Sequence, residues 1–269
     1  MSNTKSATPI AEVLCFGNEL LNGRTVNTNA TFIGKHLTLA GFHISRITTA
    51  EDSRSVAISV IEEIVQRKPY LLIITGGLGP TWDDITLACL AAALNKPLVR
   101  NSQAEQLMKD AYARFKLEIK PESYKMTDFP QGANPIFNPI GTAPGIHLKH
   151  ENLEIFVLPG VPSEMKPMLA EYVLPLISKA SASFFFEELF VVEGVPESYL
   201  AETITKVRDE FNPVWVKSHP MGTEGNPRIE FQLTLHSVSK EDSELIHNAT
   251  QRLKSLIKEK FRDVVVINP

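Results

Sequence analysis

Short apolar segments alternate with amphipathic helical patterns through the first 177 residues of this 269-residue chain. The apolar segments 12–16 and 70–75 lack a regular polar alternation, which is typical of strands covered on both faces. Such strands, when they alternate with helices, indicate a mostly parallel sheet between two helical layers. We therefore predict a three-layer αβα fold with strands at 12–16, 43–49, 70–75 and 154–158, helices at 29–39, 53–66, 84–94 and 103–115, and a last helix ending near 177.

The small residues Ala180–Ser183 suggest a domain boundary, and we predict domains at 1–179 and 180–269. The second domain carries the pattern βαββαβ, which matches a small split-βαβ α+β domain. Its strands are expected at 184–192, 214–218, 228–235 and 264–267, and its helices at 197–210 and 240–260.

Composition excludes several classes of function. With 27 Lys+Arg against 31 Asp+Glu the net charge is -4, so no general attraction to nucleic acid is expected. The polar N-terminus and the lack of a long apolar segment predict a cytoplasmic protein that does not enter a membrane. Cys15 and Cys89 lie in apolar stretches and are expected to be buried, reduced thiols, and the seven histidines show no metal-ligand spacing.

The loop after strand 70–75 carries the strongest functional signal. Gly76, Gly77 and Gly79 stand between a strand and a helix, where bare backbone N–H groups and the helix N-terminus can bind phosphate. Asp83 and Asp84 follow at the start of the predicted helix. Either acid alone could be a helix cap, but two together indicate a metal that bridges carboxylate and phosphate oxygens. The loop lacks the Gly-Lys-Ser/Thr ending of a Walker loop.

A second polar segment, residues 17–29, follows the first strand. Glu19 could hold a metal or polarise water, and we expect it at a buried position where its charge needs a partner. Arg24 could pair with phosphate, while Asn27 and Asn29 could contact ribose or phosphate. The alternative is a turn rich in helix-capping residues.

Two further loops are rich in proline and glycine. Residues 138–145 form either a rigid connection or a second backbone wall against a ligand. Residues 158–165 join a strand to a helix, and Ser163 and Glu164 are either capping residues or, for Glu164, a contact to metal or water.

These four loops, in this order, resemble the N-terminal region of the CinA family, which is related to the molybdopterin-binding domains of molybdenum-cofactor biosynthesis. The resemblance rests on Gly17-Asn-Glu-Leu-Leu with Asn27-Thr-Asn29, on Thr75-Gly-Gly-Leu-Gly-Pro-Thr-Trp-Asp-Asp-Ile-Thr86, on Asn138-Pro-Ile-Gly-Thr-Ala-Pro-Gly145 and on Leu158-Pro-Gly-Val-Pro-Ser-Glu-Met165.

The resemblance implies a molybdopterin-binding fold followed by a KH-like domain, and metal-dependent hydrolysis of ADP-ribose to AMP and ribose 5-phosphate. A related domain of eukaryotic FAD synthases is credited with FAD hydrolysis, so the dinucleotide stays open. The expected ions are Mg²⁺, Co²⁺ or Mn²⁺, with K⁺ as a further candidate. The chain ends before the amidase domain that many CinA proteins carry, so we expect no deamidase activity.

In this hypothesis Asp84, Asp83 and Glu19 are catalytic, and Asp84, Glu19 and Glu164 hold the metal. The partners are a small nucleotide substrate and a second copy of the chain, since the small domain is assigned to dimerisation or to covering the site. The expected substrate-binding residues are Gly17, Asn18, Arg24, Asn27, Asn29, Thr75, Gly76, Gly77, Gly79, Thr81, Gly141, Thr142, Ala143, Gly145, Pro159, Gly160 and Ser163.

Three alternatives remain. The chain could bind a pterin or nucleotide without catalysis, or transfer adenylyl groups or molybdenum in cofactor biosynthesis, because a shared fold does not settle the chemistry. It could also bind nucleic acid through the small domain. However, a KH domain needs its Gly-x-x-Gly between two helices, whereas Gly222 and Gly225 are predicted to lie between strands.

Overall fold

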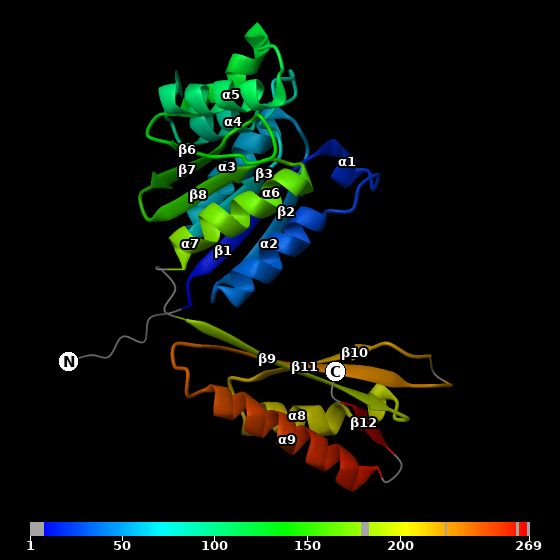
Figure 1. Cartoon of the computed structure of the whole chain (residues 1–269). Coiled ribbons are helices and arrows are strands. Elements are labelled where there is room, and N and C mark those ends of the chain that lie inside the picture. Colours follow the sequence, from blue (N-terminus) through cyan, green and yellow to red (C-terminus); the bar gives the residue numbers. More distant parts are fainter. Residues whose placement is uncertain (1–7, 179–182, 224, 262–263, 268–269) are drawn as a thin grey trace, which may run out of the picture. The chain divides into compact units, whose positions relative to one another are not determined.

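A computed structural model describes residues 8–178, 183–223, 225–261 and 264–267 of the chain. Contacts divide it into two compact units, one within Pro9–Ser181 and the other within Ala182–Pro269 (Figure 1). The predicted boundary between residues 179 and 180 lies outside the described residues. No helix in the described part of the chain has the length and apolar character needed to cross a membrane.

The first unit is built on a six-stranded sheet in the order β2-β1-β3-β8-β7-β6. Strands β2, β1, β3 and β8 are parallel, whereas β7 and β6 are added as antiparallel strands at one side. The mostly parallel sheet predicted from the sequence is therefore confirmed. The strands are β1 (Ile10–Phe16), β2 (His43–Ala50), β3 (Leu71–Thr75), β6 (Asn134–Ile136), β7 (Gly145–His150) and β8 (Leu153–Leu158).

Helices cover both faces of this sheet, which makes the three predicted layers (Figure 1). Alternate residues of β1 enter different hydrophobic clusters: Leu14 packs on one side of the sheet and Val13 on the other. A fully buried Leu or Val contributes about 1.5–3 kcal/mol, so burial on both faces fixes these strands. One layer holds α3 (Arg54–Arg67), α4 (Thr86–Ala93) and α5 (Ser102–Phe115), and the other holds α2 (Thr28–Leu39), α6 (Pro162–Met168), the π-helical turn η2 (Leu169–Val173) and α7 (Leu174–Ile177).

Several short elements were not predicted. They span three to seven residues each, so no sequence period can develop in most of them. The single helix expected to end near residue 177 is also divided, because η2 interrupts it between Pro167 and Pro175. Besides β6 and β7, the unpredicted elements are α1 (Asn18–Leu21), β4 (Leu98–Arg100), η1 (Pro121–Thr127) and β5 (Asp128–Pro130).

The second unit has the predicted βαββαβ order. Its antiparallel sheet runs β10-β11-β9-β12, so β11 lies between the strands that α8 connects and β9 lies between the strands that α9 connects, as in a split βαβ. Gly222 and Gly225 lie between β10 and β11 rather than between helices. The elements are β9 (Phe184–Glu193), η3 (Glu197–Tyr199), α8 (Ala201–Glu210), β10 (Trp215–Pro220), β11 (Arg228–Ser237), α9 (Ser243–Lys260) and β12 (Val265–Ile267).

A buried charge lies within β1, between the strands β2 and β3. Glu12 is 2% exposed and receives two hydrogen bonds from Arg67 of α3, at 2.9 Å from Nε and 2.7 Å from an Nη. Removing one partner of a buried ion pair leaves an unpaired charge in the core, which is strongly destabilising.

We predict that Arg67→Met lowers the free energy of unfolding of the first unit by about 3 kcal/mol. Urea denaturation followed by circular dichroism measures this loss. Arg46→Met is the matched control, because Arg46 is exposed on the neighbouring strand β2 and its loss should cost about 0.5 kcal/mol or less. Equal losses for the two substitutions would show that the Glu12–Arg67 ion pair does not contribute to stability more than an exposed arginine does.

Candidate functional site

A cleft of about 560 Å³ opens at the carboxyl ends of the parallel strands. We call it the acid cleft, because Glu19, Asp52, Asp83, Asp84 and Glu164 all line it. Parallel strands end at a common rim of the sheet, and ligands of such folds bind there. All four loops singled out in the sequence reach this rim. Their predicted site residues that line the cleft are Gly17, Glu19, Gly76, Gly77, Gly79, Asp83, Asp84, Thr142, Ala143, Pro159, Gly160 and Glu164.

A smaller side pocket of about 70 Å³ lies next to the acid cleft. It is lined by three more of the predicted residues, Asn27, Asn29 and Thr75, at the N-terminus of α2 and the end of β3. Glu19 and Gly160 line both cavities. The predicted residues therefore form two adjoining compartments.

Six predicted residues line neither cavity. Asn18 donates its backbone N–H to Asp52 at 3.0 Å, and Thr81 bonds to the cleft acids. Arg24 and Ser163 are exposed, while Gly141 and Gly145 are packing positions. At Gly145, in β7, a Cβ would lie 2.7 Å from Cε of Met168, so this glycine serves the packing of β7.

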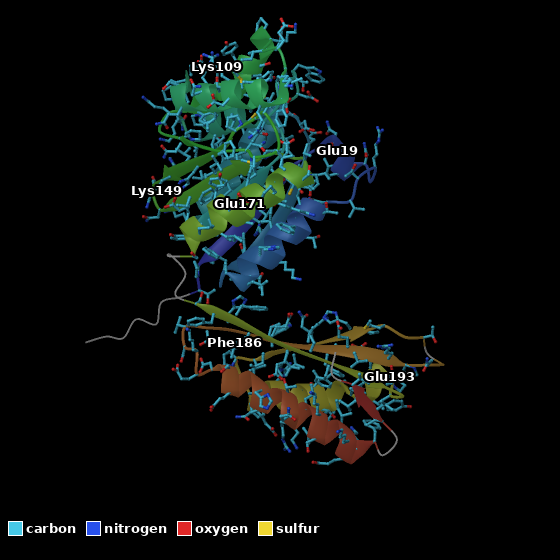
Figure 2. All side chains as sticks on the ribbon, in the orientation of Figure 1. Glu19, Lys109, Lys149, Glu171, Phe186 and Glu193 are labelled. Carbon is cyan, nitrogen blue, oxygen red and sulfur yellow. The ribbon has the colours of Figure 1, made fainter. Side chains whose placement is uncertain are left out.

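Glu19 is exposed, so the expectation that it occupies a buried position is wrong. The chain leaves the sheet at Gly17 and forms the single-turn helix α1, which has no buried residues. Glu19 therefore projects from the edge of the unit (Figure 2). Its carboxylate reaches the cleft from solvent and needs no buried counter-charge.

The loop after β3 holds its two acids in fixed positions. Asp84 Oδ2 accepts hydrogen bonds from Thr81 N at 2.9 Å and from Thr81 Oγ1 at 2.7 Å, and the same hydroxyl reaches Asp83. The side chain of Lys125, from η1, donates to the carbonyl of Thr81. Helix α4 begins only at Thr86 and has no side-chain cap, so neither acid has the alternative role of a helix cap.

Asn138 organises the loop 138–145, although no role was assigned to it from the sequence. It is 4% exposed, and its Oδ1 accepts from Gly141 N at 2.7 Å and Ile140 N at 3.1 Å. Its Nδ2 donates to Ala143 O at 2.9 Å and to Glu164 Oε2 at 2.7 Å. One buried amide thus closes the loop and holds the cleft acid Glu164, for which a Cβ at Gly141 would leave no room.

Asp52 is a cleft residue that the sequence reasoning missed. It follows β2 by two residues, and the rule that drew attention to acids after the other parallel strands would have found it. Burial raises the pKa of the Asp52 carboxyl, the hydrogen bond from Asn18 lowers it, and the charges of Glu19, Asp83 and Asp84 raise it further. The pKa of Asp83 is lowered, first by the hydroxyl of Thr81 and also by the charge of Lys125.

The cleft does not contain a preassembled metal site. Within the described residues, no three His, Cys, Asp or Glu side chains converge closely enough to hold an ion alone. Mg²⁺, however, is usually bound by one or two carboxylates together with substrate phosphates and water. The residues therefore fit a cation that arrives with a phosphate ligand, and they do not fit a permanent structural metal.

Comparisons with known proteins agree with this architecture. Residues 12–179 match the family described as "Probable molybdopterin binding domain". A protein of Metallosphaera sedula is 39% identical over 251 residues, which cover 93% of this chain and 94% of the relative. A protein of Pyrobaculum aerophilum is 39% identical over 257 residues, covering 94% and 96%.

Among solved structures, this chain is similar to the protein CinA of Thermoplasma acidophilum, whose function is described as unknown. The two are 35% identical with a TM-score of 0.56, and the match covers 64% of this chain and 98% of that one. The fold predicted for the first unit is confirmed by this match and by the family.

Gly76 allows β3 to end against β1. Its φ is +99°, and a Cβ there would lie 2.6 Å from the carbonyl oxygen of Phe16. We predict that Gly76→Ala lowers the free energy of unfolding by about 1–3 kcal/mol more than Gly132→Ala does. Gly132 is the matched control, because its φ is +90° but a Cβ would have nothing within 4 Å. Thermal denaturation of both variants measures the difference. Equal losses of unfolding free energy would contradict the prediction, because the backbone would then avoid the contact with Phe16 without cost.

The raised pKa of Asp52 has a defined sign for stability. The folded state binds this proton more tightly than the unfolded state, so stability falls as pH rises from the ordinary Asp range through the raised pKa. We predict that Asp52→Asn raises the melting temperature at pH 7.5, in the presence of a chelator, by about 2 °C, or roughly 0.5 kcal/mol after solvent screening.

This gain should shrink as the pH falls toward the ordinary Asp range. Asp110→Asn is the control, because Asp110 is exposed on α5, away from the acid cleft. A lower melting temperature for Asp52→Asn at neutral pH would contradict the prediction.

Proposed function

The chain belongs to the family of the molybdopterin-binding domain, and we propose that its acid cleft hydrolyses the pyrophosphate bond of a nucleotide. ADP-ribose, cleaved to AMP and ribose 5-phosphate, is the expected substrate type. The observation that carries the proposal is the meeting of five carboxylates and a glycine loop at one rim of the sheet. Acids and bare amides suit a cation and a diphosphate bound together.

The charge balance of the cleft favours such a cation. Five carboxylates and no Lys, Arg or His are among the described residues that line it, and Lys125, which acts on the pKa of Asp83, is engaged with the carbonyl of Thr81. Two unit charges 4 Å apart interact by about 1 kcal/mol in water and by several times more in a partly buried site. A diphosphate alone would therefore be repelled, and binding depends on Mg²⁺, Mn²⁺ or Co²⁺, with K⁺ as a further candidate. When bound, the metal would neutralise phosphate charge and increase the acidity of water.

The residues of the chain divide the remaining work. The N–H groups of residues 77–79 bind phosphate oxygens, since the N–H of Gly76 already donates to Leu158 O. One or two of the expected metal ligands Asp84, Glu19 and Glu164 would hold the cation together with the phosphate. Hydrolysis forms a bond from water oxygen to phosphorus, breaks the anhydride P–O bond and releases one proton from the water. Asp52 can take this proton on Oδ1, because Oδ2 is occupied by the Asn18 N–H and its raised pKa makes it a better base.

A second candidate function is the binding of a pterin phosphate or a nucleotide without turnover. A related one is the transfer of an adenylyl group. The description of the matching family, which refers to molybdopterin binding, favours binding. In both cases the phosphate would still use the loop amides. Formation of AMP from ADP-ribose without an acceptor substrate separates hydrolysis from these alternatives.

We predict that the purified full chain releases AMP and ribose 5-phosphate from ADP-ribose with Mg²⁺, Mn²⁺ or Co²⁺, and that a chelator abolishes the reaction. Asp84→Asn should reduce turnover about 100-fold or more, since it weakens binding of the cation that would neutralise the phosphate charge, while circular dichroism stays unchanged. Asp110→Asn should retain activity. An Asp84→Asn protein with full activity would rule out this role for Asp84, and absence of AMP across ADP-ribose, FAD, NAD and nucleoside diphosphate sugars would favour the binding candidate.

A further inference from the structure

The side pocket adjoins the acid cleft closely enough to serve the same ligand. Phe16, Glu19, Gly160 and Pro162 line both cavities. The pocket lies at the N-terminus of α2, a helix of twelve residues. A ligand whose phosphates occupy the acid cleft can therefore extend a neighbouring group into the side pocket.

Asn29 lines this pocket and carries a buried acceptor that is not used. It is 7% exposed, and its Nδ2 donates to the carbonyl of Gly160 at 2.7 Å. If the amide were flipped, Oδ1 would face the carbonyl oxygen of Gly160. The contact therefore assigns Nδ2 to the Gly160 side and Oδ1 to the other side. Oδ1 is buried and has no hydrogen-bond partner in the described part of the chain. Such an unpaired acceptor costs about 1–3 kcal/mol, which a ligand with a suitable donor would recover.

Asn27, two residues earlier, shows the contrast. Its Oδ1 accepts from Ala30 N at 3.0 Å, and its Nδ2 donates to Thr49 Oγ1 at 3.3 Å. Asn27 therefore caps α2 and has both ends of its amide engaged. Of these two asparagines, Asn29 is the one that can respond to a ligand.

Charge decides between a phosphate and a neutral group as the occupant. The N-terminus of α2 favours an anion by about half an elementary charge. Against this stand the full negative charge of Glu19, which lines the pocket, and the lone pairs of Asn29 Oδ1, which repel phosphate oxygens. A volume of about 70 Å³ equals roughly two water molecules, which suits the hydroxylated edge of a sugar ring.

We propose that Asn29 selects the sugar of the ligand: Oδ1 accepts a hydrogen bond from one hydroxyl, while the phosphates lie in the acid cleft. The identity of the ligand as a sugar phosphate of nucleotide type rests on the proposed function. The selectivity for a hydroxyl is argued from the unpaired Oδ1 of Asn29. A ligand that lacks the hydroxyl leaves this acceptor without a partner and therefore binds more weakly.

The test uses calorimetric titration of the full chain with ligands that undergo no turnover, in the presence of Mg²⁺. The panel contains AMP, ribose 5-phosphate, 2′-deoxy-AMP, 3′-deoxy-AMP, 2-deoxyribose 5-phosphate and inorganic phosphate. For the unmodified chain, at least one deoxy analogue should bind about 10-fold more weakly than its parent. In Asn29→Ala the parent should weaken by about the same factor and the deoxy analogue should not, so that their ratio falls to about one.

Asn101→Ala is the matched control. Asn101 also donates to a backbone carbonyl, that of Ala133, and caps a helix, but its Oδ1 is engaged with Ala104 N and it lines neither cavity. This variant should lose stability and keep the hydroxyl ratio of the unmodified chain.

The proposal is overturned if the unmodified chain binds no parent ligand or does not distinguish parents from deoxy analogues, as it would if a structural water satisfied Asn29. It also fails if Asn29→Ala retains the discrimination. Because the first comparison uses only the unmodified chain, it can overturn the proposal even if Asn29→Ala does not fold. If the chain distinguishes parent ligands from deoxy analogues but does not hydrolyse ADP-ribose, the hydroxyl site is supported and the proposed hydrolysis is wrong. If it hydrolyses ADP-ribose without this distinction, only the hydroxyl site is wrong.

Discussion

The first unit depends on one constraint: its four parallel strands end at the same rim, and three of them, β1, β3 and β8, are buried almost throughout. Because β1, β2, β3 and β8 run in one direction, each of the loops that follow them must begin at this rim. Residues separated by more than a hundred positions, such as Glu19 and Glu164, thereby line one cleft. The hydrophobic layers supply the stability, and the loops are free to carry polar groups that a core could not accept.

Much of the fold could be predicted, because the signals were local. The buried strands and their helices carry apolar periodicities long enough to recognise, and three of the four functional loops directly follow predicted strands. The strands β4, β5 and β6 were missed because each spans only three residues, too few for an apolar period to develop. β7 pairs with β8 through a short hairpin, so its signal was local and was overlooked. The helix ending near 177 is interrupted between Pro167 and Pro175, which are also local signals that the apolar periodicity outweighed.

Within the candidate site, the sequence identified the reactive residue types better than their burial and their contacts. It found Glu19 but placed it in a buried position, because the turn of the chain at Gly17 into an exposed helix has no apolar signature. It missed Asp52, which stands alone without a glycine motif beside it. It also missed Asn138, whose role arises from hydrogen bonds to groups up to 26 residues away. A residue that acts by holding others has no chemical signature of its own in the sequence.

The amide of Asn138 has a mechanical consequence. It grips the carbonyl of Ala143 on the wall of the cleft and the carboxylate of Glu164 on α6 with the same nitrogen. Ala143 and Glu164 both line the acid cleft, so a shift of the loop at Ala143 also disturbs the hydrogen bond that positions the Glu164 carboxylate. One buried nitrogen thus couples a backbone group of the cleft to one of its acids, and the two are expected to move together.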